Sequence, residues 1–282
     1  MDGGRCSATS AAAGEREPGP LETMSRADVS EAVDYGLAAG RSVRTLLRAL
    51  AQAGCPIGRS SFHVLRCDAA VGGGFAPEHG VILCHNRLHT RREVLNALAH
   101  ELLHAYDHCR GGGGAAWQTE EAAGEAGAGA LGDGPTELRA SGAAVVEAGG
   151  AAAAAAQAGP GPGPGHEAPA AGPPGAGCGG GGGGGGLDWS DCRQHACTEI
   201  RAANLSGDCS LWQELQRGNL PLAPTAWAAQ QRACVARRAA LSCALNPGCG
   251  GPEGAAQAVA AALPACLADT APFGPDQAVA RP

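Results

Sequence analysis

The feature that most limits the fold of this chain is a long glycine-, alanine- and proline-rich tract in its middle. Residues 111–186 hold 27 of the 46 glycines in the 282-residue sequence. This composition offers too few apolar side chains to offset the conformational entropy lost on ordering. The sequence therefore predicts a disordered, flexible insertion, with a retained intron as an alternative origin. The remainder, roughly 200 residues, is enough for one domain but hardly for two.

The tract divides the chain into five predicted segments. They are a disordered N-terminal segment over 1–27, the first half of a domain over 28–110, the insertion over 111–186, a helical second half over 187–275 and a tail over 276–282. The first segment has neither the apolar stretch of a secretory signal nor the acid-poor composition of a transit peptide.

Charge and hydropathy exclude two classes of function. The formal net charge is −7, and the sequence contains arginine but no lysine. An acidic chain without a basic cluster is not expected to bind nucleic acid. No window reads as about 20 strongly apolar residues, so we expect no transmembrane helix.

The pattern of apolar residues predicts an α+β fold. Residues 28–53 have helical spacing, with Gly36 and Gly40 allowing two pieces. Short strands are predicted at 62–67, 74–76 and 81–84, as a small antiparallel meander. A helix begins after Thr90, which forms a capping box with Glu93, and further helices are predicted at 190–203, 208–217, 225–245 and 252–268. Among the apolar residues expected in the core are Leu211, Trp212, Leu215 and Leu241.

Residues 100–104 read His-Glu-Leu-Leu-His on the helix that follows Thr90. At 3.6 residues per turn, His100 and His104 share one face, about 6 Å apart along the axis, and can bind one Zn²⁺. Glu101 points about 100° away, outside the ligand set but near enough to act as general base on a water at the metal. The pattern therefore predicts a zinc hydrolase with Glu101 as its catalytic residue. The alternative is a surface helix with solvated histidines.

A catalytic zinc usually has three protein ligands, and the motif supplies two. His108 lies about 12 Å from His100 along a straight helix, too far to share an ion. Some zinc peptidases carry the third histidine six residues after the second, but residue 110 of this chain is Arg. Glu199, on a later helix, is the first candidate, and His195, one turn earlier, is another.

Thirteen cysteines are spread along both halves of the predicted domain, and no C-x-x-C pair occurs. This distribution suits disulfides formed in an oxidising compartment, although several could be buried free thiols. The odd total leaves at least one cysteine without an intrachain partner.

Several segments resemble a known family. They are HELLHAYDHCR at 100–110, HACTEIRAANLSGDCS at 195–210, VILCHN at 81–86, Gly73–Gly74–Phe75 and the PFG of 272–274. They are similar to the mitochondrial inner-membrane zinc metalloproteases that assist ATP synthase assembly, also known as Ku-binding proteins. The similarity covers roughly residues 40–110 and 187–275, and the insertion is extra.

The resemblance implies a zincin-like domain with one zinc ion at His100 and His104 and catalysis by Glu101. It also implies a peripheral enzyme on the intermembrane-space side of the mitochondrial inner membrane, which processes the precursor of ATP synthase subunit a. Eight cysteines fall where the family carries them, which favours disulfides: Cys55, Cys67, Cys84, Cys109, Cys197, Cys209, Cys234 and Cys266. Cys6, Cys178, Cys192, Cys243 and Cys249 have no obvious counterpart.

Two other functions remain open. The chain could be an assembly chaperone for the membrane sector of ATP synthase, with proteolysis dispensable. A nuclear DNA-repair partner, suggested by the family's other label, lacks the basic patch that such a role needs.

Overall fold

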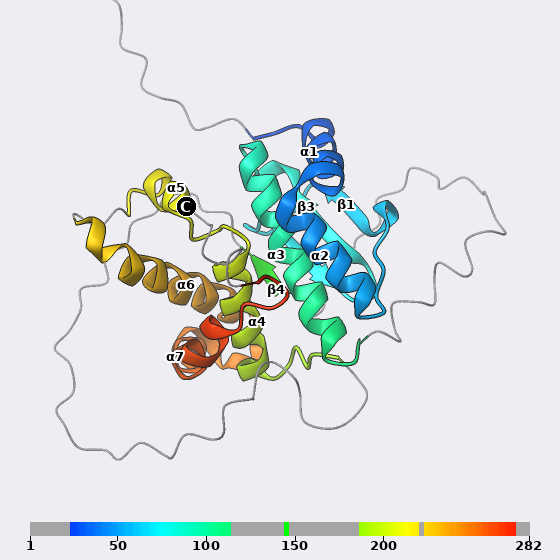
Figure 1. Ribbon diagram of the computed structural model, residues 1–282. Coiled ribbons are helices and arrows are strands. Elements are labelled where there is room, and N and C mark those ends of the chain that lie inside the picture. Colours follow the sequence, from blue (N-terminus) through cyan, green and yellow to red (C-terminus); the bar gives the residue numbers. More distant parts are fainter. Residues whose placement is uncertain (1–22, 114–143, 147–185, 220–222, 275–282) are drawn as a thin grey trace, which may run out of the picture.

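The helix that carries His100 and His104 runs between two groups of helices, as Figure 1 shows. The computed structural model describes residues 23–113, 144–146, 186–219 and 223–274. Predictions for 1–22, for most of 111–186 and for 275–282 fall outside the described residues.

The N-terminal half consists of three helices and a small sheet. Helix α1 spans Arg26–Ala39, α2 spans Arg41–Gln52 and α3 spans Arg91–Arg110. The expected break falls at Gly40, which ends α1 and begins α2. Close packing requires the earlier glycine, because a Cβ at Gly36 would come within 2.9 Å of Leu95 and Leu98 on α3.

The sheet is mixed, so the predicted antiparallel meander was wrong in its topology. Strands β1 (Phe62–Leu65), β2 (Gly73–Ala76), β3 (Gly80–Cys84) and β4 (Ala144–Val146) lie in the order β1-β3-β2-β4. β2 and β3 form the expected antiparallel pair, but β3 lies between β2 and β1 and runs parallel to β1. The tight turn explains the difference, because it fixes only the β2–β3 pairing and leaves the place of β1 to longer-range packing.

Strand β4 comes from the tract in which the sequence predicted no fixed structure. It pairs antiparallel with β2, with Gly74 opposite Val145. Val145 and Val146 are β-prone, and the edge of β2 away from β3 offers hydrogen-bonding groups.

The C-terminal half is helical, as expected. It consists of α4 (Cys192–Leu205), α5 (Leu211–Gln216), α6 (Trp227–Cys243) and α7 (Gly251–Ala268). Short 3-10 turns occur at Arg59–Ser61, His85–Arg87, Pro224–Ala226 and Pro247–Cys249. The whole is α+β, as predicted. No helix in the described part of the chain is long and apolar enough to cross a membrane.

Two apolar cores flank the contact between α3 and α4. One combines α1, α2, the sheet and α3, and the other combines α4, α6 and α7. Ten of the 14 residues of α4 are buried, because this helix packs against α3 on one side and against α6 and α7 on the other. Side chains that face the α3–α4 contact are therefore removed from water whatever their polarity.

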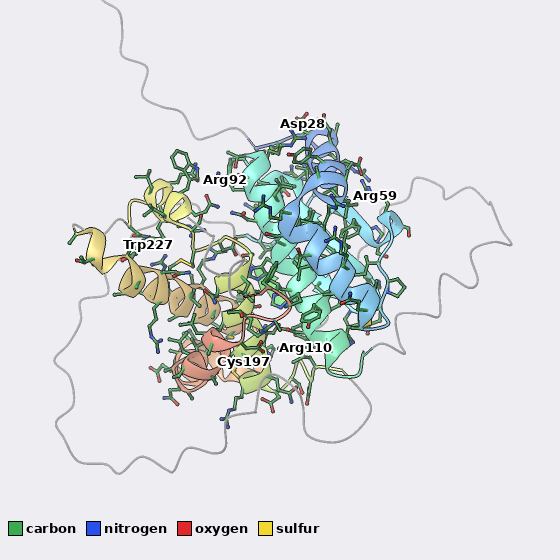
Figure 2. The ribbon with its side chains drawn as sticks, viewed as in Figure 1. Asp28, Arg59, Arg92, Arg110, Cys197 and Trp227 are labelled. Atoms are coloured by element: carbon green, nitrogen blue, oxygen red, sulfur yellow. A yellow bond between two sulfur atoms is a disulfide. The ribbon has the colours of Figure 1, made fainter. Side chains whose placement is uncertain are left out.

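Four residues expected in the core lie at the surface instead. Leu211, Trp212, Leu215 and Leu241 are 43–49% exposed. α5, which carries three of these residues, is short and has few neighbours. Arg92 of α3 lies next to α5 (Figure 2), with its guanidinium 5.9 Å from the ring centre of Trp212. Helical spacing alone does not show that a helix is covered on its apolar face.

Among the described cysteines, five disulfides form, and each lies within one half of the chain. Cys55–Cys109 and Cys67–Cys84 lie in the first half, and Cys192–Cys249, Cys197–Cys266 and Cys209–Cys234 in the second. The eight cysteines that match the resemblance pair entirely among themselves. Cys243 is the free thiol among the described cysteines, and burial raises its pKa well above the ordinary range.

Removing Cys55–Cys109 should lower the melting temperature. This disulfide closes a 54-residue separation between the end of α2 and the end of α3. A loop of that size is worth about 3–4 kcal/mol, which for a domain of this size corresponds to about 6–16 °C. Calorimetry of the Cys55→Ser/Cys109→Ser double variant measures this shift. Cys243→Ser is the matched control, since it removes a thiol without opening a loop. Equal melting temperatures for the double variant and the wild type would contradict the stapling role.

Candidate metal centre

Helices α3 and α4 bring three metal-binding side chains together. Nε2 of His100 lies 3.5 Å from Oε2 of Glu199, and Nε2 of His104 lies 3.5 Å from Oε1 of the same carboxylate. The imidazole centres are 4.8 Å apart. His100 and His104 are one turn apart on α3, and the packing of α4 across that turn places Glu199 opposite both. The expected pair and the first candidate for the third ligand therefore meet.

The geometry of this group fits a zinc ion. Three ligand atoms about 2.0–2.1 Å from a tetrahedral metal lie about 3.3 Å from one another, close to the observed separations. All three side chains are at most 1% exposed. The Nε2 atoms of His100 and His104 have no hydrogen-bond partner in the described structure, although each ring's other nitrogen has one. Buried polar atoms are rarely left this way, and a cation would satisfy both.

Outer hydrogen bonds set the orientation of both rings. Nδ1 of His100 donates to Oδ2 of Asp208 at 2.9 Å. Thr198 donates its hydroxyl hydrogen to Asp107 at 2.9 Å, so its oxygen accepts from Nδ1 of His104 at 3.0 Å. Both arrangements turn the Nε2 lone pairs toward Glu199, as the carboxylate partners of metal-binding histidines generally do.

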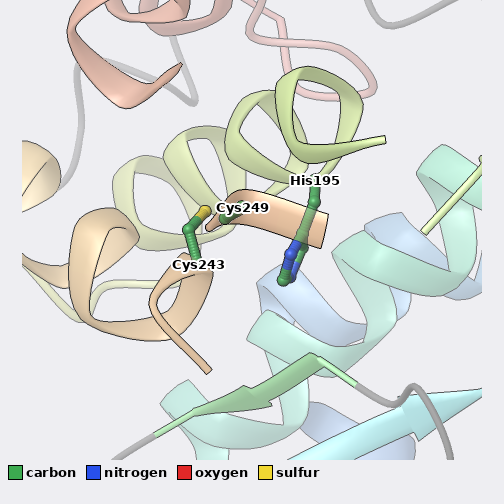
Figure 3. Close-up of side chains that lie close together, drawn as sticks. All are labelled: His195, Cys243 and Cys249. Atoms are coloured by element: carbon green, nitrogen blue, oxygen red, sulfur yellow. The ribbon is translucent and has the colours of Figure 1, made fainter. Parts of the chain in front are cut away.

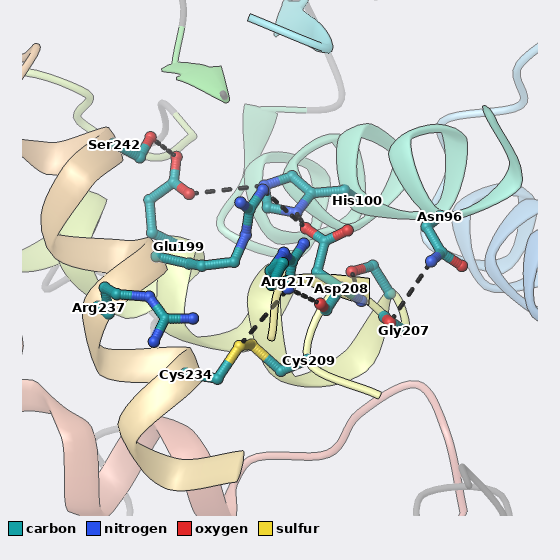
Figure 4. A network of polar contacts seen from close by, with 12 residues as sticks. Asn96, His100, Glu199, Gly207, Asp208, Cys209, Arg217, Cys234, Arg237 and Ser242 are labelled. Carbon is teal, nitrogen blue, oxygen red and sulfur yellow. Dashed lines mark hydrogen bonds and ion pairs between the residues drawn. A yellow bond between two sulfur atoms is a disulfide. The ribbon is translucent and has the colours of Figure 1, made fainter. Parts of the chain in front are cut away.

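The Asp208 carboxylate is itself held in place (Figure 4). The carboxylate lies 3.6 Å from the guanidinium of Arg238. The main-chain carbonyl of Asp208 accepts a hydrogen bond from the Arg217 guanidinium at 2.6 Å. Burial would raise the pKa of Asp208, but Arg238 and His100 outweigh that effect and lower it. Asp208 is therefore an anion beside His100 at neutral pH.

The electrostatics of the site favour a cation. Burial would lower the pKa of His100, but Asp208 and Glu199 raise it to about 10. Burial lowers the pKa of His104 to about 3, which leaves that ring neutral. Burial would raise the pKa of Glu199, yet the facing rings of His104 and His100, of which His100 carries the proton, bring it well below its usual range. Without a metal, a proton on His100 compensates the buried carboxylates; a divalent cation can take its place.

Glu101 lies beside this group without a hydrogen-bond partner. It is fully buried, and neither carboxylate oxygen is bonded in the described structure. Burial raises its pKa to about 8. The backbone of β2 passes close by, since a Cβ at Gly73 would come 3.1 Å from Oε1 of Glu101 and 2.7 Å from the carbonyl oxygen of Ile82. Glycine at this position keeps space for the carboxylate.

The two other candidate ligands lie elsewhere. The His108 ring stacks on Trp189, 6.4 Å between centres, on the side of α3 nearest Gly113 and Gly186. The Nε2 atom of His195 lies 3.2 Å from Oε1 of Glu199. Ser242 donates to the same oxygen at 2.7 Å. His195 and Ser242 therefore contact the same carboxylate oxygen of Glu199 that faces His104.

Sequence reasoning missed Asp208, Thr198 and Arg201. Arg201 is 0% exposed, although arginine is rarely buried, and it binds Asp107 through both carboxylate oxygens at 3.0–3.1 Å. Asp208 and Thr198 lie inside the segment that carried the resemblance, but no spacing rule connects them with α3. Only the packing of α4 on α3 reveals what they contact. The alternative of a surface helix with solvated histidines was wrong, because His100 and His104 are buried.

The sequence of the chain is similar to the sequences of known proteins. The model of the Peptidase M76 family matches residues 27–125 and 185–274. A protein named mitochondrial inner membrane protease ATP23 from Lodderomyces elongisporus is 26% identical over 77% of this chain and 58% of its own length. Proteins of the same name from Mycosarcoma maydis and Saccharomyces cerevisiae S288c are 27% and 28% identical over 73% of this chain. The chain spans 58–63% of the length of these three relatives. No solved structure matches it significantly.

Replacing Asp208 should weaken metal binding without removing a ligand. Asp208→Asn takes away the charge that orients His100, and loss of such a partner typically costs about 10–100-fold in metal affinity. Competition with a chromophoric zinc chelator measures the change. The control is Asp188→Asn, on the exposed segment before α4, where no effect is expected. Unchanged zinc affinity in a folded Asp208→Asn variant would contradict the assigned role.

Proposed function

Because the chain belongs to the Peptidase M76 family, we propose that it is a zinc-dependent metalloendopeptidase with one catalytic zinc ion per chain. His100, His104 and Glu199 hold the metal, and Glu101 is the general base. The observation that carries this proposal is the convergence of two unpartnered Nε2 atoms on one buried carboxylate, with a second, unbonded carboxylate beside them.

The proposed ligand set agrees with the chemistry of zinc. Two imidazoles and one carboxylate are a ligand combination known from zinc peptidases, and they leave a fourth position open. Zinc bound there would act as a Lewis acid that polarises the peptide carbonyl and favours ionisation of water. The hydrogen bonds from His100 to Asp208 and from His104 to Thr198 fix both rings before any substrate arrives.

Glu101 does the proton transfer in this proposal. Its carboxylate accepts a proton from the attacking water and later gives that proton to the leaving amine, so it ends the cycle as it began. It is suited to both steps because no neighbouring group in the described structure is hydrogen-bonded to its oxygens. The nearby positive charge of a metal would lower its pKa from the value near 8 that burial produces, which favours the basic form before catalysis.

Cell location and substrate are further parts of the proposal. The relatives' names give the mitochondrial inner membrane. The five disulfides between described cysteines suit the oxidising side of that membrane, which favours the intermembrane space. We propose a peripheral enzyme that processes the precursor of ATP synthase subunit a and assists ATP synthase assembly, as the resemblance implies. An assembly chaperone without need of proteolysis is the alternative, and nothing in the geometry requires it.

Replacing the general base should separate catalysis from metal binding. Glu101→Gln is expected to lower cleavage of the subunit a precursor by at least about 100-fold, because proton transfer is lost while all three ligands stay. The variant should keep its zinc, measured by elemental analysis. Glu31→Gln, exposed on α1, is the control and should cleave normally.

The same variant tests the chaperone alternative. Introduced into mitochondria that lack their own enzyme, Glu101→Gln should let precursor accumulate, and ATP synthase assembly then shows whether proteolysis is dispensable. Undiminished cleavage by zinc-loaded Glu101→Gln would refute the proposed mechanism.

A further inference from the structure

A second cluster of side chains of metal-binding type lies next to Glu199, which its member His195 contacts. One ring nitrogen of His195 and the sulfur atoms of Cys243 and Cys249 lie within 4.8 Å of one another, and all three residues are buried (Figure 3). They come from the first turns of α4, the end of α6 and the 3-10 turn Pro247–Cys249. Both cysteines are among those for which the family resemblance gave no obvious counterpart.

A further cysteine, Cys192, is joined to this cluster by a disulfide with Cys249. The sulfur of Cys192 lies 1.96 Å from that of Cys249, in the disulfide that joins the start of α4 to the 3-10 turn. In the oxidised chain two of the three sulfurs are therefore used by the disulfide. Reduction frees them while they remain beside Cys243 and His195.

The hydrogen bonds of His195 show which of its nitrogens could bind a metal. Asn246 donates from its Nδ2 to the carbonyl of Trp189 at 2.7 Å and accepts at Oδ1 from Gly248, which fixes its orientation. The same Nδ2 lies 2.8 Å from Nδ1 of His195, so Nδ1 is the acceptor. The hydrogen of the ring is then on Nε2, where it points to Glu199. The lone pair on Nδ1 therefore faces Asn246, next to the turn that carries Cys249. A metal bound at Nδ1 would replace the hydrogen bond from Asn246.

We propose that the chain binds a second zinc ion through Cys192, Cys243, Cys249 and His195 when the Cys192–Cys249 disulfide is reduced. Three thiolates and one imidazole form a common closed, tetrahedral structural zinc site. The metal would join α4, α6 and the 3-10 turn as the disulfide does in the oxidised chain. Nε2 of His195 would keep its hydrogen bond to Glu199, as the second nitrogen of metal-bound histidines generally bonds to a carboxylate.

A phosphine can supply the two electrons that reduce the Cys192–Cys249 disulfide. The phosphine and one water convert the disulfide into the two thiols of Cys192 and Cys249 and yield the phosphine oxide. A zinc ion then displaces the protons of three thiols, which are released to solvent. Reoxidation of the two thiols would destroy the site and release the metal.

Cobalt substitution tests the proposal on the full-length chain. Protein reduced with a phosphine and desalted without oxygen is titrated with Co²⁺, and sulfur ligation is read from thiolate-to-cobalt charge-transfer absorption in the near ultraviolet. We expect about two cobalt ions per chain, with about one left and most of this absorption lost in Cys243→Ser. Cys67→Ser is the matched control, because it removes a thiol outside the cluster and should keep the band. Equal bands in the wild type and Cys243→Ser, or equal losses in both variants, would overturn the proposal.

A variant of the oxidised chain tests the same site without reductant. Cys192→Ser frees Cys249 and leaves the other four disulfides intact. Purified with Zn²⁺ present, it should hold about one more zinc ion than Cys192→Ser/Cys243→Ser. Equal zinc content in the two would contradict the proposal. The outcome is independent of the peptidase site, which contains no sulfur, so His104→Ala should keep the charge-transfer band of the reduced chain even if the first site is lost.

Discussion

The buried contact between α3 and α4 is the interaction on which the candidate site depends. Arg201 of α4 binds Asp107 of α3 with both side chains 0% exposed. The carboxylate of Asp107 also accepts from Thr198, which in turn orients His104. One buried ion pair therefore joins the two halves and orients a proposed metal ligand. Removing one partner of such a pair leaves an uncompensated buried charge, which costs about 3–5 kcal/mol.

The disulfides stabilise the residues that orient the ligands rather than the ligands themselves. Cys197, next to Thr198, is bonded to α7, and Cys209, next to Asp208, is bonded to α6. The outer partners of His104 and His100 are thus each anchored one residue away from a covalent link. Among the described cysteines no disulfide joins the two halves, so α3 and α4 meet through packing, hydrogen bonds and charge.

The sequence alone suggests the residues of the candidate site, but not the side chains that orient them. His100, Glu101 and His104 could be proposed from one spacing, because helical geometry alone determines their positions relative to one another. Glu199 could be named as a candidate, but its meeting with the two histidines needs the tertiary contact of α4 with α3. Asp208 and Thr198 bond to side chains 108 and 94 residues away, which no local pattern encodes. The sheet shows the same limit, since the turn predicted the β2–β3 pair and packing alone decided where β1 lies.

The most direct test of this account is X-ray absorption of the zinc in the oxidised full-length protein, purified without added metal. We predict about one zinc ion per chain whose nearest shell, at about 2.0–2.1 Å, contains only nitrogen and oxygen, with the scattering of two imidazoles. Replacement of Glu199 by Ala should remove an oxygen from that shell. A shell that contains sulfur, or a protein without stoichiometric metal, would contradict the assignment of His100, His104 and Glu199.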